Sequence, residues 1–206
     1  MSDQETARCF YTAMRAEINQ HLAIVNQIYT LYLAGITALY AGSLYKDGNP
    51  NLLLLIPFLS LGAANMLGSH ERAIGSIAAY CAQDLNSILN KNGEAVVQWD
   101  RSTMLRNYKD SHYASNRAGG LTLIVIPGIA ALFLNIFLRL SSTNPVWSQV
   151  KLIAWIVGAL CLTRAGWVIV QTARYRKKLG DTHNEPNSEE GSRSFTNRVY
   201  SRLRIR

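Results

Sequence analysis

Residues 22–45 read LAIVNQIYTLYLAGITALYAGSLY, and no charged side chain occurs anywhere in this stretch. A transmembrane helix needs roughly 17–25 predominantly apolar residues, so the stretch is long enough to cross a bilayer. A helix at the surface of a soluble domain would interrupt such a stretch with charged residues along one face. Here the interruptions are amides, hydroxyls and small residues only. The stretch therefore predicts a membrane-spanning helix.

Three more stretches have the same character, at 52–68, 120–138 and 152–171, and the only charge inside them is Arg164. The chain has 206 residues and a net charge of +8, with the charge gathered between the apolar stretches. This pattern excludes a disordered or collagenous chain and argues against a soluble globular domain. We expect an all-α fold, an integral membrane four-helix bundle with helical extensions into the cytoplasm.

Lysine and arginine are distributed unequally between the connecting segments. The loops after the first and third spans carry only Lys46, Arg139 and Lys151, and all other basic residues outside the spans fall on the opposite side. Because basic loops stay in the cytoplasm, we expect a multi-pass protein of the bacterial inner membrane with both termini inside. The expected segments are an N-terminal extension (1–20) and a first transmembrane hairpin (21–68). They continue with a cytoplasmic helix and a basic and aromatic segment (69–118), a second transmembrane hairpin (119–171) and a flexible basic tail (172–206).

Both of the first two spans are expected to continue into the cytoplasm as helices. Apolar residues recur every four positions into the first span, at Phe10, Met14, Ile18 and Leu22. After the second span a three–four spacing continues until Asn90-Lys91-Asn92-Gly93, and its members are Ile74, Ile77, Cys81, Leu85 and Ile88. We expect these two stripes to pack against each other as an antiparallel pair, or against a neighbouring subunit.

Polar residues inside the spans are the first candidate site. One side of the first span carries Asn19, Ala23, Asn26, Thr30, Thr37 and Ala41. Amides in hydrocarbon need partners or water, so the row either packs helices together or faces a pore formed by several subunits. Arg164 has two similar interpretations. Its side chain extends to the inner interface, or it faces inward, where it pairs with Asn65 or lines a pore.

Two features predict how the later spans pack. In the fourth span a stripe of small residues suits close helix contact, and its members are Ala154, Gly158, Cys161 and Ala165. In the third span Pro127-Gly128 predicts a kink.

Ionisable residues gather where the first two spans reach the cytoplasm. Glu17 and His21 share one helix face, and His70-Glu71-Arg72 is expected at a similar depth. We interpret this group as a charge-paired collar at the inner boundary. The sharper alternatives are a pH gate or a metal site formed by Glu17, His21 and His70.

A second cytoplasmic candidate is the segment 98–117, whose candidate ligand-binding residues are Trp99, Arg101, Arg106, Tyr108, Lys109 and Arg117. Rings that stack beside cations that pair with phosphate suit a nucleotide or an oligonucleotide. Aromatic and basic residues also gather at membrane interfaces, which is the other interpretation. The amphipathic, arginine-rich residues 194–206 predict contact with the anionic inner leaflet, with nucleic acid as the alternative.

The sequence holds no motif of a hydrolase nucleophile, a phosphate-binding loop or a zinc site. We therefore expect neither catalysis nor a bound cofactor or metal. The chain has three cysteines, Cys9, Cys81 and Cys161. They imply no disulfide framework, so we expect reduced thiols.

The stretches 14–21 (MRAEINQH) and 70–80 (HERAIGSIAAY), with a later Trp99-Asp100, resemble a family of small bacterial four-span inner-membrane proteins. Members of that family show an Arg-Ala-Glu-Ile entry and a basic-Ile-x-x-Ile-x-x-Tyr exit, and most have no assigned function. Here Ala73 separates the basic residue from the isoleucine. The architecture is also similar to that of membrane effectors of antiphage systems, which oligomerise and disrupt the membrane when a nucleotide or oligonucleotide signal changes.

These observations predict a homo-oligomeric membrane effector or channel-like protein, gated from the cytoplasmic side by a ligand or a soluble partner. By the likeness to antiphage effectors, that ligand would be a nucleotide signal. The alternative is a non-conducting scaffold that recruits a soluble partner through its cytoplasmic helices and arginine-rich tail.

Overall fold

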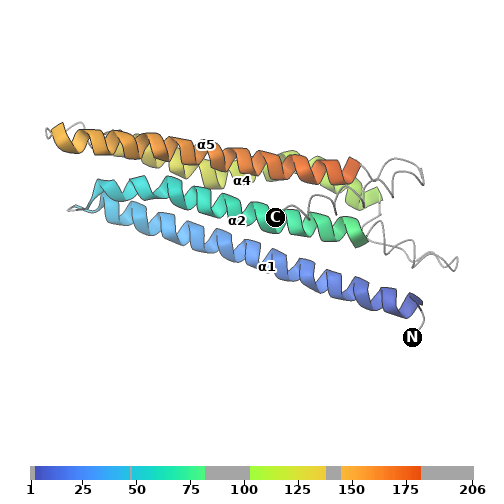
Figure 1. Ribbon diagram of the computed structural model, residues 1–206. Helices are drawn as coiled ribbons and strands as arrows, with labels where there is room; N and C mark the ends of the chain where they lie inside the picture. Colours follow the sequence, from blue (N-terminus) through green and yellow to red (C-terminus); the bar gives the residue numbers. More distant parts are fainter. Residues whose placement is uncertain (1–2, 47, 82–102, 138–144, 182–206) are drawn as a thin grey trace, which may run out of the picture.

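The computed structural model describes residues 3–46, 48–81, 103–137 and 145–181. Its elements are helix α1 (Asp3–Leu44), the 3-10 helix η1 (Pro50–Leu55), α2 (Ile56–Tyr80), α4 (Thr103–Phe137) and α5 (Pro145–Asp181). No strand occurs within these ranges. The predicted all-α four-helix bundle is confirmed, and Figure 1 shows the four long helices running along one common axis.

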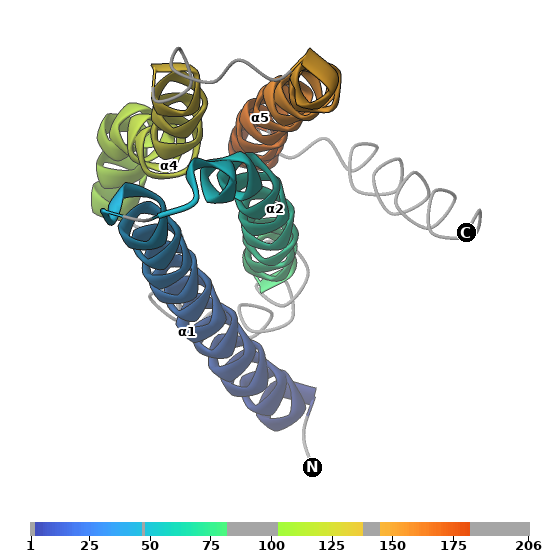
Figure 2. The same ribbon diagram turned by 90° about the vertical axis from the view of Figure 1, so that its left-hand side faces the viewer.

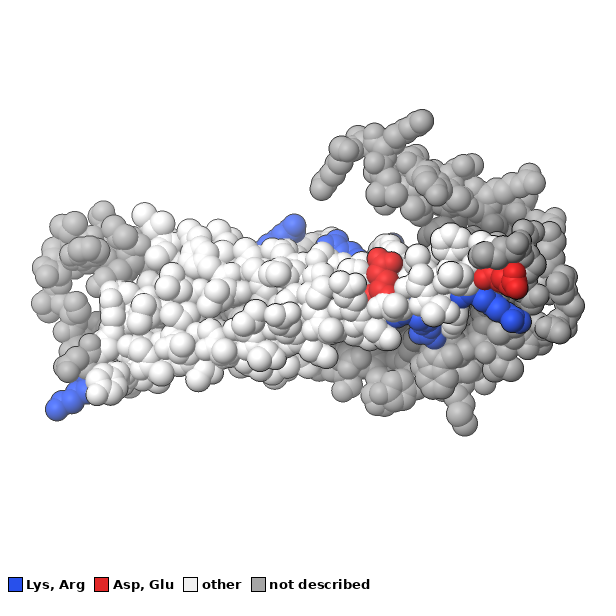
Figure 3. Space-filling model, turned by 90° about the horizontal axis from the view of Figure 1, so that it is seen from below, with Lys and Arg blue, Asp and Glu red and all other residues white. Residues whose placement is uncertain are grey.

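Each predicted span lies in a helix that is long and apolar enough to cross a membrane. These helices are Glu5–Leu44, Pro50–Tyr80 (with η1 as its first turns), Gly119–Phe137 and Leu152–Arg176. Figure 3 shows a long belt without acidic side chains, and the acidic side chains in view gather toward one end. We call this the charged end: α1 begins there, and α2 and α5 finish there (Figure 1). The chain is a multi-pass membrane protein.

The helices pack around α2. α1 and α2 form an antiparallel hairpin joined through η1, and α4 packs against α2 and α5. α2 and α5 run in the same direction, because Pro57 lies beside Gly158 and, farther along, Gly68 lies beside Thr172. Figures 1 and 2 show α1 and α5 on opposite sides of α2. Each of these two helices therefore keeps a side that no other described helix covers.

The small residues of α5 allow this close approach, as the sequence predicted. Gly158, Cys161 and Ala165 are buried, and Ala154 is partly buried. A Cβ at position 158 would lie 3.3 Å from both the Pro57 ring and Leu132, so a larger side chain would push α5 away from α2 and α4. Small residues at such crossings let membrane helices gain van der Waals contact.

The two ends of the predicted apolar stripe of α1 do not pack against other described residues of the chain. Phe10 is 53% exposed and Leu22 is also exposed, whereas Ile18 is buried and Met14 is partly buried. A step of four residues advances 400° around a helix of 3.6 residues per turn, so a strict four-residue repeat drifts off the packed face. The buried residues of α1 instead follow a mostly three–four spacing and include Ala7, Ile18, Val25, Ile28, Tyr32 and Ile36.

The antiparallel pairing of the two helical extensions is confirmed within the described residues. Ala7 of α1 and Cys81, which directly follows α2, form a buried cluster. Tyr11, Met14 and Ile77 pack against this cluster. The remaining predicted members Leu85 and Ile88, and the predicted stop at 90–93, lie outside the described residues.

Two boundaries differ from the prediction. The second span opens as the 3-10 helix η1, whose preceding Asn49 side chain accepts a hydrogen bond from the Asn51 backbone N–H at 3.0 Å. α4 begins at Thr103 and continues without interruption through Gly119 and Pro127. Much of the basic and aromatic segment is therefore the first part of the same helix that forms the third span.

Candidate functional site

The polar row of the first span points away from the rest of the chain. We call the residues of this row, Asn19, Ala23, Asn26, Thr30, Thr37 and Ala41, the polar face of α1, and every one of them is exposed. Gln20 and Gln27 beside the row are exposed as well. Neither Asn19 nor Asn26 hydrogen-bonds through its side chain to another described residue. Both predicted roles, helix packing and pore lining, therefore require something other than the described residues.

The two threonines of the polar face satisfy their own hydroxyl hydrogens. Thr30 Oγ1 donates to the carbonyl of Asn26 at 3.0 Å, and Thr37 Oγ1 donates to the carbonyl of Leu33 at 2.8 Å. Such bonds leave a hydroxyl tolerable in hydrocarbon while its oxygen can still accept a hydrogen bond. The amides have no such local solution, so they carry most of the cost of facing lipid.

Hydrogen bonds from two tyrosines, the buried Tyr32 and the partly buried Tyr40, attach the opposite side of α1 to the bundle. Tyr32 Oη lies 2.9 Å from Ser60 Oγ of α2 and donates to the carbonyl of Ile124 of α4, also at 2.9 Å. Tyr40 Oη donates to the carbonyl of Pro127 at 2.7 Å. These bonds join α1 to α2 and α4, and they hold α1 in the rotation that turns its polar face outward.

The sequence analysis did not single out these tyrosines. A proline inside a helix deprives the carbonyl four residues earlier of its N–H partner and disturbs the neighbouring turn. The tyrosine hydroxyls reach carbonyls in that disturbed part of α4. Tyr32 and Tyr40 are eight residues apart in the charge-free stretch 22–45. That spacing, together with Pro127 in another span, was the signal in the sequence that could have indicated their hydrogen bonds. Asn135, whose Nδ2 donates to the carbonyl of Pro50 at 2.7 Å, was missed in the same way.

Two histidines meet where α1 and α2 approach the charged end. His21 Nδ1 and His70 Nδ1 are 2.8 Å apart, with ring centroids at 5.1 Å and a tilt of 54° between the rings. On the other side of its ring, His21 Nε2 lies 3.9 Å from the Glu17 carboxylate. One nitrogen of the pair must donate and the other accept, so at least one imidazole is neutral in this contact. We call these three residues the histidine pair with its carboxylate.

The other predicted residues of the inner boundary have different partners. Glu71 Oε2 lies 3.4 Å from Arg176 Nη1 of α5, a partner that the sequence analysis did not name. Arg72 Nε donates to the carbonyl of Gly68 in its own helix at 2.9 Å. Three of the five predicted residues thus form the histidine pair with its carboxylate between α1 and α2. Glu71 forms an ion pair between α2 and α5, and Arg72 bonds within α2.

No metal centre forms in the part of the chain that the structure describes. A group of three ligating side chains in suitable positions does not occur there. The two Nδ1 atoms that face each other engage one another, and the Glu17 carboxylate approaches the opposite nitrogen of His21. The Glu17 carboxylate and the His70 ring therefore approach different nitrogens of His21.

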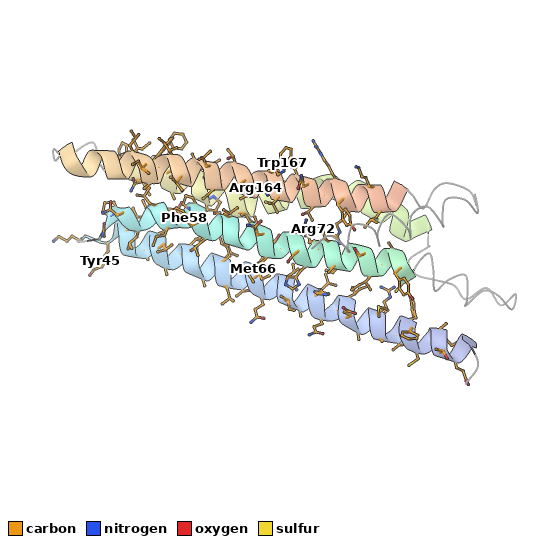
Figure 4. The ribbon with its side chains drawn as sticks, viewed as in Figure 1. Tyr45, Phe58, Met66, Arg72, Arg164 and Trp167 are labelled. Atoms are coloured by element: carbon orange, nitrogen blue, oxygen red, sulfur yellow. The ribbon has the colours of Figure 1, made fainter. Side chains whose placement is uncertain are left out.

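Arg164 lies on α5, farther from the charged end than Arg72 on α2, and Trp167 lies near it (Figure 4). Its side chain is exposed, and it has neither a hydrogen bond nor an ion pair with a described residue, Asn65 included. The charge is therefore presented to the outside of the bundle between the exposed residues Leu160 and Trp167.

The predicted ligand-binding residues lie mostly where side chains are not described. Trp99 and Arg101 lie outside the described residues. The structure places the backbone of Arg106, Tyr108, Lys109 and Arg117 on the first part of α4. The basic residues 194–206 also lie outside the described ranges.

Comparison with family models, with curated proteins and with solved structures found no match for this chain. The function is therefore argued from the geometry described above.

Proposed function

We propose that this protein is an oligomeric effector of the bacterial inner membrane, in which several copies surround a water-lined pathway formed by the polar face of α1. The observation that carries the proposal is the outward direction of that face. Its amides lie on the uncovered side of a helix whose sequence is long enough to cross the bilayer and free of charge from residue 22 to residue 45. Such a face needs water or polar partners, and copies arranged around it supply both.

The packing of α1 supports this arrangement. A helix free to rotate would turn its amides toward the interior of its own bundle. The hydroxyls of Tyr32 and Tyr40 prevent this, because each is already bonded to α4 from the opposite side of α1. The polar face consequently stays available to other copies.

The gate belongs at the charged end, which we assign to the cytoplasm because most of the basic residues flank it. There the histidine pair with its carboxylate links α1 to α2. A ligand or soluble partner that binds the open and closed arrangements with different affinity would shift the equilibrium between them. The basic and aromatic start of α4 suits a nucleotide signal of an antiphage system as that ligand.

The test is the membrane potential of bacteria that express the full chain, read with a voltage-sensitive dye. Expression of the native chain is expected to depolarise the cells, and the double variant Asn26→Leu, Thr30→Leu is expected to abolish the effect. Leu31→Ile, Leu33→Ile, which changes apolar residues of the same helix, is the matched control and should depolarise like the native chain. Depolarisation that persists unchanged in the Asn26, Thr30 variant would contradict the proposal.

The second candidate is a scaffold that recruits a soluble partner and conducts nothing. It is favoured by Phe10, which is 53% exposed on the N-terminal extension of α1. Large side chains that fill a pocket on a partner carry much of the binding energy at protein interfaces, and the exposed Phe10 ring is available for this role. In that case Phe10→Ser would remove partner binding, whereas Asn26→Leu, Thr30→Leu would leave both binding and membrane potential unchanged.

A further inference from the structure

Arg164 and the amides of α1 lie at the same depth of the bundle. Pro57 of α2 lies beside Gly158 of α5, and these helices run in parallel, so residue 63 of α2 is level with Arg164. Tyr32 of α1 bonds to Ser60 of α2, and these helices run antiparallel, so residue 63 is also level with residue 29 of α1. Arg164 is therefore level with the part of the polar face that holds Asn26 and Thr30.

The side of the bundle that Arg164 occupies follows from a bond closer to the charged end. Tyr175 Oη of α5 lies 3.2 Å from Ser76 Oγ of α2, across the exposed edge between these helices. Eleven residues are about three turns of helix, so Arg164 on α5 and Asn65 on α2 lie along the same edge. The charge is thus on the α2–α5 side of the molecule, whereas the polar face belongs to α1, on the other side of α2 (Figure 2).

Arg164 has no hydrogen bond or ion pair with any described residue of its own chain. Arg164 lies midway along the apolar span Leu152–Arg176, about 18 Å from either end at 1.5 Å per residue. This distance is more than an extended arginine side chain covers, so the guanidinium lies at a level that the apolar parts of the helices surround. A guanidinium has five donors and no acceptor, and a charge in hydrocarbon is held against protein groups or water.

The polar face of α1 offers the complement. The side-chain oxygens of Asn26 and Gln27 and the hydroxyl oxygen of Thr30 are acceptors on exposed residues. The geometry points to a heterologous contact between two copies, in which Arg164 of one copy donates to the side-chain oxygens of Asn26 and its neighbours on α1 of the next. One contact of this kind supplies a partner to the unpaired donors of one face and to the unpaired acceptors of the other.

Such a contact joins two different faces, so its repetition generates a ring or a row of copies and not a two-fold dimer. The polar face of each α1 is then covered in part by the next α5, and the remainder faces the centre of the assembly. The inference rests on the oligomer of the proposed function but not on conduction, because a non-conducting assembly would form the same contact.

The contact is tested by disulfide cross-linking between two differently tagged copies of the full chain, co-expressed in membranes. The native cysteines Cys9, Cys81 and Cys161 are replaced by alanine. One copy carries Ala34→Cys and the other Leu160→Cys, and both positions are exposed. They share one level, because Gly35 of α1 lies beside Leu59 of α2, and Leu59 is level with Leu160 by the contact of Pro57 with Gly158. Both substitutions leave Arg164 and Asn26 in place.

The expected result is a cross-linked species that contains both tags. The matched control pairs Ala34→Cys with Phe133→Cys, which is exposed on α4, and should give only background. Adding Arg164→Leu to the copy that carries Leu160→Cys should lower the yield by about tenfold, the effect of one charge-assisted hydrogen bond, and Arg164→Lys should restore part of it.

Two results would overturn the inference. One is cross-linking between two Ala34→Cys copies without any between Ala34→Cys and Leu160→Cys, which would show an isologous contact of α1 with itself. The other is a yield that Arg164→Leu leaves unchanged. Cross-linking is read without reference to membrane potential, so its failure is distinct from a failure of the pore.

Discussion

Replacing Tyr32 by phenylalanine removes one hydroxyl that serves three helices. That hydroxyl lies 2.9 Å from Ser60 Oγ and 2.9 Å from the carbonyl oxygen of Ile124, and the side chain is buried. Hydrogen bonds between membrane helices contribute about 0.6 kcal/mol on average and up to about 1.7 kcal/mol. Two such bonds are lost when the hydroxyl is removed. We therefore expect Tyr32→Phe to lower the free energy of unfolding by about 1–2 kcal/mol.

The assay is equilibrium unfolding of the purified chain in bicelles, measured by steric trapping. Tyr45→Phe is the matched control, because Tyr45 is 75% exposed and its change should have almost no effect. Tyr40→Phe, which removes a single bond to Pro127, should have about half the effect of Tyr32→Phe. A double-mutant cycle of Tyr32→Phe with Ser60→Ala should show coupling between the two hydroxyls. A loss for Tyr32→Phe no larger than that for Tyr45→Phe would refute the claim that tyrosine bonds fix the rotation of α1.

Three further expectations concern the charged end and the contact of α2 with α5. Because His21 Nδ1 and His70 Nδ1 are 2.8 Å apart across the α1–α2 contact, His70→Phe should remove this hydrogen bond and move α1 away from α2 there. Spin-label distances between the two helices should be longer in His70→Phe than in the native chain, and distances that do not change would contradict the link. A Cβ at position 68 would lie 3.0 Å from Thr172 Oγ1 and from Val168 Cγ1 of α5. Gly68→Val should therefore destabilise the fold in the unfolding assay, and the smaller Gly68→Ala should do so less. Glu71→Arg should be destabilising, and Arg176→Glu in the same chain should recover about 0.2–1 kcal/mol, which the double-mutant cycle measures.

The sequence predicted the four spans well because span length and absence of charge are properties of each helix alone. The stripe of small residues around Gly158 was predicted for the same reason, because small residues at helical spacing form one face of a helix whatever its partner. The apolar stripe of α1 failed at Phe10 and Leu22, because a repeat of four residues drifts around the helix.

Contacts between helices could not be read from any single stretch. The partners of Tyr32 are a hydroxyl in another span and a backbone carbonyl in a third, and only the relative register of three helices brings them together. The same holds for Arg176, which meets Glu71 because α2 and α5 run in parallel. The sequence predicted that His21 and His70 lie at a similar depth. Their direct contact could not be predicted, because it depends on the register of α1 against α2.

The most direct test of the proposed pathway is whether water and ions touch the polar face of α1. The purified full chain, without its native cysteines, is incorporated into a planar bilayer, and the current is recorded while a charged methanethiosulfonate reagent is added. Thr30→Cys is expected to lose its current upon modification. Leu31→Cys, which is one residue further along and is also exposed on the single chain, is expected to keep it. A current through Thr30→Cys that the reagent leaves unchanged would contradict a pathway lined by α1.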